Sequence, residues 1–143
     1  VDEYQIWEAR AHGADLVLLI VAALDEQTLR EFLELTESLG MNALVETHTP
    51  EEIEVAQRIG AKIVGINVRN LKTLEVNNEH YASLAAHLPN SVIKVAESGV
   101  AGIEDVRAYA GAGADAVLIG EALVRSGDPE GTVREFSKVS VTR

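Results

Sequence analysis

Polar side chains with acid, base or hydrogen-bonding chemistry stand at the ends of three apolar runs in the sequence. They are Glu46 after Ala-Leu-Val, Asn67 and Arg69 in Gly-Ile-Asn-Val-Arg, and Glu97 and Ser98 after Val-Ala. Desolvation raises the pKa of a buried carboxyl and a nearby cation lowers it, which allows proton transfer near neutral pH. Glu46 and Glu97 are therefore candidate acids or bases, although either one could instead only orient other side chains.

A glycine follows each of the last two apolar runs, in Ser98-Gly99-Val100 and Ile119-Gly120-Glu121. Backbone N–H groups at such turns and at helix N-termini bind phosphate without help from Lys or Arg. Either glycine taken alone could equally serve a tight turn. The pair of them at two successive strand ends predicts a phosphate site.

The four histidines, His12, His48, His80 and His87, do not have the spacing of metal ligands, and we expect no metal site. His48 lies two residues after Glu46, where a strand-end histidine most often makes a structural hydrogen bond. We expect the larger aromatic residues in helical segments to be packing residues rather than substrate platforms. These are Tyr4, Trp7, Tyr81 and Tyr109.

A repeated junction indicates how these groups are positioned. In each copy a glycine can take the left-handed conformation that ends a helix, and an apolar run follows. The copies begin at Gly13, Gly40, Gly60 and Gly113. Strands are predicted at 17–24, 43–48, 62–68, 92–97 and 116–120. Their nearly continuous apolar character is typical of a parallel sheet buried on both faces.

Amphipathic helices are predicted between the strands, including 27–39 and 50–59. Thr49-Pro50 and Asp128-Pro129 have the residue types that begin helices. The pattern predicts one α/β domain over residues 1–143, a helix followed by five strand-helix units. Periodicity permits either a barrel or an open doubly wound sheet. Both place the ligand beyond the carboxyl ends of the strands, where the polar residues converge.

Composition limits the possible partners and location. A formal net charge of -11 argues against binding to nucleic acid or to an anionic membrane. The sequence has no Cys, no apolar run of about 20 residues and no signal-peptide pattern in residues 1–10, so the cytoplasm is the expected compartment. A chain of 143 residues is shorter than a complete (β/α)8 barrel, which needs roughly 250.

Several motifs, in order along almost the whole chain, resemble the C-terminal part of bacterial indole-3-glycerol phosphate synthase. The most specific are Gly65-Ile66-Asn67-Val68-Arg69-Asn70-Leu71 and Ala96-Glu97-Ser98-Gly99, with Leu44-Val45-Glu46-Thr47-His48 and Ile119-Gly120-Glu121-Ala122 beside them. The resemblance implies a partial (β/α)8 TIM barrel, with about five parallel strands, the fourth to the eighth, and their helices. The first three strands would be absent.

The resemblance also implies an activity in tryptophan biosynthesis. The family is a carboxy-lyase that converts 1-(2-carboxyphenylamino)-1-deoxyribulose 5-phosphate to indole-3-glycerol phosphate, carbon dioxide and water, without a cofactor. Glu46 would then transfer protons and Asn67 would hold a substrate hydroxyl. The residues that would bind the rest of the substrate are Arg69, Glu97 and Ser98, and those that would receive its phosphate are Gly99, Gly120 and the backbone at Glu121.

Two departures from the family pattern affect these expectations. Many relatives carry Ser at the position of Glu121, and an anionic Glu121 must turn away from a bound phosphate. The family's catalytic Lys, in a Lys-Asp-Phe segment, and a Glu and a Lys of the first strand have no counterpart in the chain. We therefore expect an incomplete and inactive fragment with two open sheet edges through which it self-associates.

Two other interpretations stay open. One is a different phosphate-binding barrel enzyme, of the phosphoribosylanthranilate isomerase or thiazole synthase type, and the Glu46, Asn67 and Arg69 set favours the synthase over it. The other is a half-barrel without catalysis that acts as a self-associating scaffold.

Overall fold

A computed structural model describes residues 1–69 and 79–141. Asn70 and Leu71 of the predicted Gly-Ile-Asn-Val-Arg-Asn-Leu motif lie outside the described residues. The elements alternate between helix and strand: α1 (Glu3–Ala11), β1 (Leu16–Ile20), the short 3-10 helix η1 (Val21–Ala23), α2 (Glu26–Ser38), β2 (Asn42–Thr47), α3 (Pro50–Arg58), β3 (Ile63–Asn67), α4 (Glu79–Ala85), β4 (Ile93–Glu97), α5 (Ile103–Gly111), β5 (Ala116–Leu118), α6 (Glu121–Arg125) and α7 (Pro129–Phe136).

The five strands follow the order β1-β2-β3-β4-β5 in the sheet, so each strand neighbours the next one along the chain. The chain divides into two compact units, unit 1 (Val1–Gly65) and unit 2 (Ile66–Arg143). No helix in the described part of the chain is both long enough and apolar enough to span a membrane.

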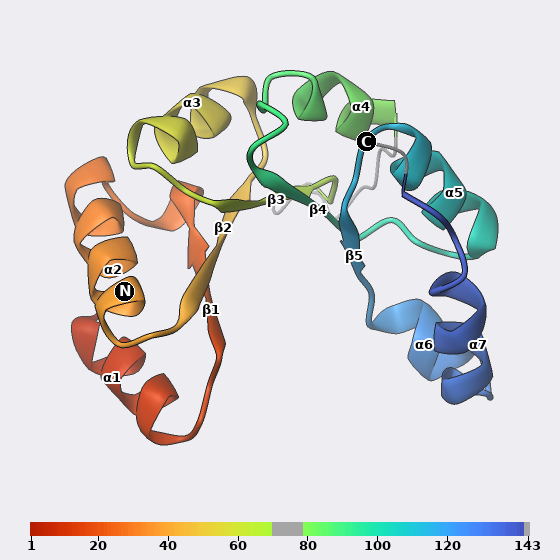
Figure 1. The fold of residues 1–143 in the computed structure, drawn as a ribbon, viewed down its shortest axis with the longest axis horizontal. Coiled ribbons are helices and arrows are strands. Elements are labelled where there is room, and N and C mark those ends of the chain that lie inside the picture. The colour runs from red at the N-terminus through yellow and green to blue at the C-terminus, as the bar shows by residue number, and fades with distance from the viewer. Residues whose placement is uncertain (70–78, 142–143) are drawn as a thin grey trace. The chain divides into compact units, whose positions relative to one another are not determined.

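Unit 1 is a parallel strand pair with helices packed on it. β1 and β2 pair in parallel, with Ile20, the last residue of β1, opposite Glu46. Figure 1 shows α1, α2 and α3 on one side of these two strands. The side chains of α2 that face the strands are buried, among them Leu29 and Phe32, which are at most 5% exposed. Their burial supplies the hydrophobic stabilisation of this unit.

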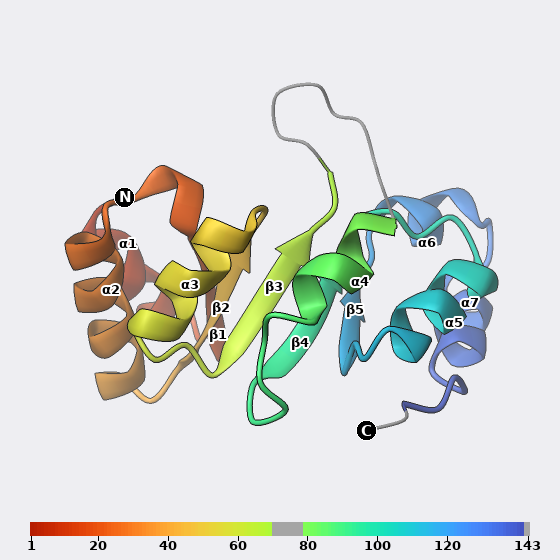
Figure 2. The same cartoon turned by 90° about the horizontal axis from the view of Figure 1, so that it is seen from above.

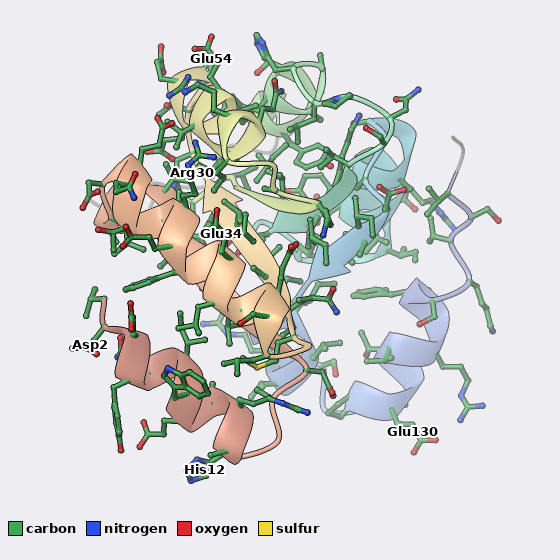
Figure 3. All side chains as sticks on the ribbon, turned by 60° about the vertical axis from the view of Figure 1, so that its left-hand side comes forward. Asp2, His12, Arg30, Glu34, Glu54 and Glu130 are labelled. Atoms are coloured by element: carbon green, nitrogen blue, oxygen red, sulfur yellow. The ribbon has the colours of Figure 1, made fainter. Side chains whose placement is uncertain are left out.

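Side-chain caps begin the helices of unit 1. Asp2, Asp25 and Thr49 each accept a backbone N–H of the first turn, which otherwise has no partner. Figure 3 shows Asp2 at the start of α1 and His12 at its end. The glycines predicted to end helices have φ between 76° and 89°, in the left-handed region, so that prediction is confirmed; they are Gly13, Gly40, Gly60 and Gly113.

Unit 2 contains the second defined strand pair. β4 and β5 pair in parallel, with Glu97 opposite Leu118, the last residue of β5. Figure 2 shows α6 following β5, with α7 next to α5. Tyr81 on α4 and Tyr109 on α5 meet edge to face in the core, with ring centroids 5.0 Å apart. The predicted packing role of these two tyrosines is confirmed.

The structure corrects two predicted strand ends. The strand predicted at 17–24 stops at Ile20, and the apolar residues Val21 to Ala23 form η1 instead. Val21 is buried in that turn, so its apolar character reflects packing and does not distinguish a strand from a turn. The strand predicted at 116–120 stops at Leu118, which places Gly120 at the start of α6.

The prediction that the strands are buried on both faces is confirmed for β2 but is wrong for the two outer strands, β1 and β5. Five of the six residues of β2 are buried, whereas Leu16 and Leu18 of β1 and Leu118 of β5 are 45–53% exposed. Each outer strand has a neighbour on one edge only in the described sheet. The predicted packing of Tyr4 and Trp7 is also wrong, because they are 66% and 51% exposed on α1, whose single buried residue is Ile6.

Candidate functional site

Glu46 and His48 form the centre of a buried polar cluster in unit 1. Glu46 is 5% exposed at the end of β2. Its Oε1 lies 3.4 Å from Nε2 of His48, whose side chain is 14% exposed. The pair is close enough for an ion pair but is not aligned as a hydrogen bond, and Nε2 has no hydrogen-bond partner among the described residues. A carboxylate beside an imidazole is a common arrangement for proton transfer.

Glu52 completes this cluster from the first turn of α3. Its Oε2 accepts the backbone N–H of His48 at 2.6 Å and lies 3.3 Å from Nδ1 of the same histidine. The Glu52 backbone N–H is in turn bound by the Thr49 side chain at 3.3 Å. The sequence Glu-Thr-His-Thr-Pro-Glu-Glu therefore folds a strand end onto the helix that follows it. The structural hydrogen bonding expected of His48 is confirmed, because Nδ1 of its ring contacts Glu52 in addition to the backbone N–H.

Unit 2 contains a cavity of about 850 Å³. Most of the residues predicted for substrate and phosphate line it: Arg69, Glu97, Ser98, Gly99, Gly120 and Glu121. The cavity is lined by the ends of β4 and β5, by the starts of α5 and α6, and by residues of α7. Strand ends and helix starts therefore meet at this cavity, as expected for a ligand site in a parallel α/β fold.

The turn after β4 has an unusual backbone conformation. Ser98 has a φ of 69° and Gly99 has a φ of 74°, so two successive residues are left-handed. A serine in this region costs free energy, which the surroundings must offset. The hydroxyl of Tyr109 donates to the Ser98 carbonyl oxygen at 3.2 Å, from a ring that is 2% exposed. Burial, with a smaller effect of Asp105, raises the pKa of Tyr109 to about 12, so the hydroxyl keeps its proton.

A carboxylate of the protein already occupies the backbone N–H groups at the start of α5. Oδ2 of Asp105 accepts the N–H of Ala101 at 2.8 Å and that of Gly102 at 3.1 Å. These two donors are therefore satisfied within the chain. An anion in the cavity would have to find other donors.

Gly120 differs from Gly99 in having no conformational need to be glycine. Its φ is -120°, which other residues adopt readily, and a Cβ built on it would meet no atom within 4 Å. The missing side chain leaves open space at the edge of the cavity. A ligand that approaches the backbone would use that space.

Glu121 lies between two arginines. Its Oε2 is 3.4 Å from Nη2 of Arg69, and its Oε1 is 3.1 Å from Nη2 of Arg125. All three side chains are at least 37% exposed, so each ion pair is weak. The carboxylate is directed to the guanidinium groups, which carry the positive charge of this cavity.

The remaining predicted residue, Asn67, is not among those that line the cavity, although Arg69 is. Its Oδ1 accepts the backbone N–H of Arg69 at 3.0 Å, and Nδ2 is the donor of the same amide. Within residues 1–69 and 79–141, no three His, Asp or Glu side chains gather as a possible metal cluster.

Sequence reasoning did not include four residues that the structure associates with these sites: Glu52, Asp105, Tyr109 and Arg125. A signal for the first two was present, because acids in a first helical turn often bind backbone N–H groups. Tyr109 gave no such signal, since its role depends on the fold that brings α5 to the Ser98 turn.

Comparisons with known proteins agree on one family. Residues 1–136 match the family model of indole-3-glycerol phosphate synthase. An indole-3-glycerol phosphate synthase from Micrococcus luteus is 65% identical over 142 residues, which cover 99% of this chain and 53% of the relative. Another from Arthrobacter is 61% identical over 137 residues, which cover 96% and 50%. The chain thus spans about half the length of the curated relatives it matches.

Solved structures are similar in fold at much lower identity. 3-Hexulose-6-phosphate synthase from Salmonella typhimurium has a TM-score of 0.82 at 18% identity, covering 96% of this chain and 66% of that one. Thiamine phosphate pyrophosphorylase from Pyrococcus furiosus has a TM-score of 0.73 at 18% identity, covering 94% and 63%. At this identity the likeness shows the fold alone, and that fold is α/β with five strands of a (β/α)8 barrel.

Proposed function

Because the chain belongs to the indole-3-glycerol phosphate synthase family, we propose that it carries the C-terminal half of that enzyme's active site. The reaction would convert 1-(2-carboxyphenylamino)-1-deoxyribulose 5-phosphate to indole-3-glycerol phosphate, carbon dioxide and water in tryptophan biosynthesis, without a cofactor. The cytoplasm is the proposed compartment. The observation that carries the proposal is the cavity of unit 2, which gathers most of the residues expected to bind the substrate.

In this proposal unit 1 supplies proton transfer through Glu46. Its burial beside an imidazole supports the role, since proton transfer needs a carboxyl group that can be either protonated or ionised. Asn67 would orient a substrate hydroxyl through Nδ2. The general-acid Lys and the first-strand Glu and Lys of the family would come from the half of the relatives' length that the chain does not span.

Unit 2 would hold the anionic end of the substrate. The phosphate would lie between the turns at Gly99 and Gly120 and accept backbone N–H groups, including that of Glu121. Arg69 would neutralise part of its charge, with Glu97 and Ser98 on the wall beside it. The open space at Gly120 and the internal capping of α5 both support this placement.

A second candidate is self-association without catalysis. The exposed Leu16, Leu18 and Leu118 on β1 and β5 favour it, because apolar edge strands pair with other chains. The partners of the chain would then be further copies of itself, with neither nucleic acid nor a membrane involved. The N-terminal half of the enzyme would cover the same strands. In a mixture of the two halves, the first candidate therefore predicts a complex between them, and the second predicts that the chain still associates with itself.

The test is co-expression of the chain with the N-terminal half of the Micrococcus luteus relative. Formation of indole-3-glycerol phosphate is followed by its fluorescence, and assembly is followed by light scattering. We expect no turnover and self-association for the chain alone, and turnover with a one-to-one complex for the pair. A pair that assembles but has no turnover would contradict the proposed activity, and a chain that is fully active alone would contradict the need for the other half.

A further inference from the structure

The His48 ring lies between two carboxylates that come from different elements. Glu46 on β2 faces Nε2 at 3.4 Å, and Glu52 on α3 faces Nδ1 at 3.3 Å. Within unit 1 these are the charged groups that face the ring, and no Lys or Arg of residues 1–65 forms an ion pair with either carboxylate. All three side chains are at most 20% exposed, so water screens their charges poorly.

Glu52 fixes the orientation of this ring. A single oxygen, Oε2, binds the His48 backbone N–H at 2.6 Å and faces Nδ1 of the same residue. A carboxylate can only accept, so Nδ1 must carry a hydrogen for this contact to be favourable. When a carboxylate holds Nδ1–H in this way, the neutral ring has its lone pair at Nε2.

The contact between Nε2 of His48 and Oε1 of Glu46 needs a proton to be favourable. With Nδ1 protonated, a neutral ring has a bare lone pair at Nε2, and an ionised Glu46 has only lone pairs at Oε1. Two acceptors 3.4 Å apart in a buried place repel each other. A proton on either atom changes this repulsion into a hydrogen bond, which is charge-assisted when the proton is on His48.

We propose that His48 is a positioning residue that shares one proton with Glu46, while Glu52 holds its ring. The inference rests on the proposed acid and base role of Glu46. In one state Glu46 is protonated and His48 is neutral, and in the other Glu46 is ionised and His48 is an imidazolium. The 3.4 Å separation closes to a hydrogen bond once a proton lies between the two atoms.

The proton balance of this arrangement is simple. When the pair acts as an acid, it starts from imidazolium and carboxylate: the Nε2–H bond breaks and an Oε1–H bond forms. That Oε1–H bond then breaks as the proton passes to the substrate, which leaves a neutral imidazole and an ionised Glu46. When Glu46 takes a proton from the substrate, the reverse transfer makes an imidazolium, which the Glu52 carboxylate stabilises. Glu46 is thereby reset between the two steps of a reaction that needs both an acid and a base.

The experiment is a long-range ¹H–¹⁵N NMR spectrum of the imidazole groups of the 143-residue chain at neutral pH. In the wild type, we expect a His48 Nε2 resonance between the positions of a protonated and a bare nitrogen, and an Nδ1 that is protonated. Glu46→Gln should move Nε2 to the position of a bare nitrogen, because the amide can donate a hydrogen bond to Nε2 but does not transfer its proton. The matched control is Glu54→Gln, which removes one charge from α3, the helix that carries Glu52, at a side chain that is 72% exposed and directed away from the strands (Figure 3).

An Nε2 resonance at the same position in wild type and Glu46→Gln would overturn the proposal. If Glu46→Gln does not fold, the wild-type chain still decides the question through the shift of Nε2 on transfer from H₂O to D₂O. A shared proton gives His48 a larger isotope shift than the exposed His12, whose Nδ1 contacts the Glu8 carbonyl oxygen at 2.9 Å. Equal isotope shifts at the two histidines would also overturn it.

The NMR result is independent of turnover, which separates this inference from the proposed function. If Glu46→Gln removes turnover in the complemented enzyme while Nε2 does not move, Glu46 acts without His48 and only the inference fails. If Nε2 moves while turnover is unchanged, the shared proton exists but the proposed role of Glu46 is wrong. His48→Asn in the complemented enzyme should narrow the pH range of turnover, an effect that loss of packing alone does not produce.

Discussion

The polar cluster of unit 1 and the cavity of unit 2 differ in how far apart in the sequence their side chains lie. The cluster comes from the seven positions between Glu46 and Glu52, one strand end and the first turn of the next helix. The cavity combines residues between Arg69 and Phe136, which belong to five successive elements and their loops. Local structure builds the first site, whereas tertiary packing builds the second.

The two sites also differ in what fills them. In unit 1 the polar atoms are buried against one another, which is the environment that the proposed proton transfer requires. In unit 2 the cavity is open at Gly120, and its arginines are held by Glu121. The difference suggests separate tests, in which changes in unit 1 affect the chemical step and changes in unit 2 affect anion binding.

Glu46→Gln should have the largest effect. In the enzyme complemented with the N-terminal half, turnover should fall by a factor of about 10² to 10⁴, the usual contribution of a positioned acid or base. Phosphate affinity measured by calorimetry should not change, since the binding groups are in unit 2. Glu54→Gln is the control, and turnover of Glu46→Gln within about threefold of wild type would remove Glu46 from the proton-transfer role.

Gly120→Ala should weaken phosphate binding about tenfold, which is about 1.4 kcal/mol, and leave the melting temperature unchanged. The added methyl meets no protein atom within 4 Å, but it fills the space through which an anion reaches the backbone. Amide NMR during a phosphate titration measures the affinity. Gly111→Ala is the matched control, because Gly111 has equally open space and lies outside the cavity. Equal affinities for the two variants would place the phosphate elsewhere.

Tyr109→Phe should destabilise unit 2 by about 1 kcal/mol, the contribution of one buried hydrogen bond. Loss of the hydroxyl also frees the Ser98 carbonyl, so Ser98 and Gly99 should leave their left-handed conformation more often. Three-bond coupling constants and hydrogen exchange at Gly99 report this directly. Tyr81→Phe removes a hydroxyl from the other ring of the same pair, which has no hydrogen-bond partner among the described residues. If both variants loosen the turn equally, Tyr109 has no special role.

The smallest effect should be a difference in how the two units respond to extremes of pH. In unit 1 the backbone N–H of Thr28 lowers the pKa of Asp25, and a hydrogen bond from Arg58 lowers that of Glu26. A lowered pKa contributes stability that is present above the unfolded-state pKa and is lost as pH falls through the folded-state pKa. Both carboxylates are exposed, so this loss in acid is small.

In unit 2 the change of stability with pH has the opposite sign. Burial raises the pKa of Tyr81, and it raises that of Tyr109 from 10.0 to about 12. Their contribution is therefore complete below pH 10 and is lost as pH rises toward 12. Hydrogen exchange of amides in β2 and β4 as a function of pH measures each unit separately. Two results would contradict this difference between the units: amides of β4 that lose protection from exchange in acid before those of β2, or amides of β2 that lose it before those of β4 in alkali.

Much of the fold was determined by the sequence itself. Glycines at 13, 40, 60 and 113 and caps such as Thr49 act within a few residues, so their helix ends and starts followed from local rules. The order of strands and helices followed from the apolar runs for the same reason. The pattern could not show that the first predicted strand ends at Ile20, since buried turns and strands are equally apolar.

For the site residues too, the sequence determined some features and the tertiary structure decided others. Strand-end position alone identified Arg69, Glu97 and Ser98 as lining residues, because parallel strands present their carboxyl ends at one edge. Tertiary structure decided which distant partner a polar group meets: Tyr109 with the Ser98 carbonyl and Glu121 with Arg69. It also decided which apolar residues stay exposed, such as Leu118. The physical reason is that residue type sets what a side chain can bond to, whereas contacts between distant segments exist only once the chain has packed.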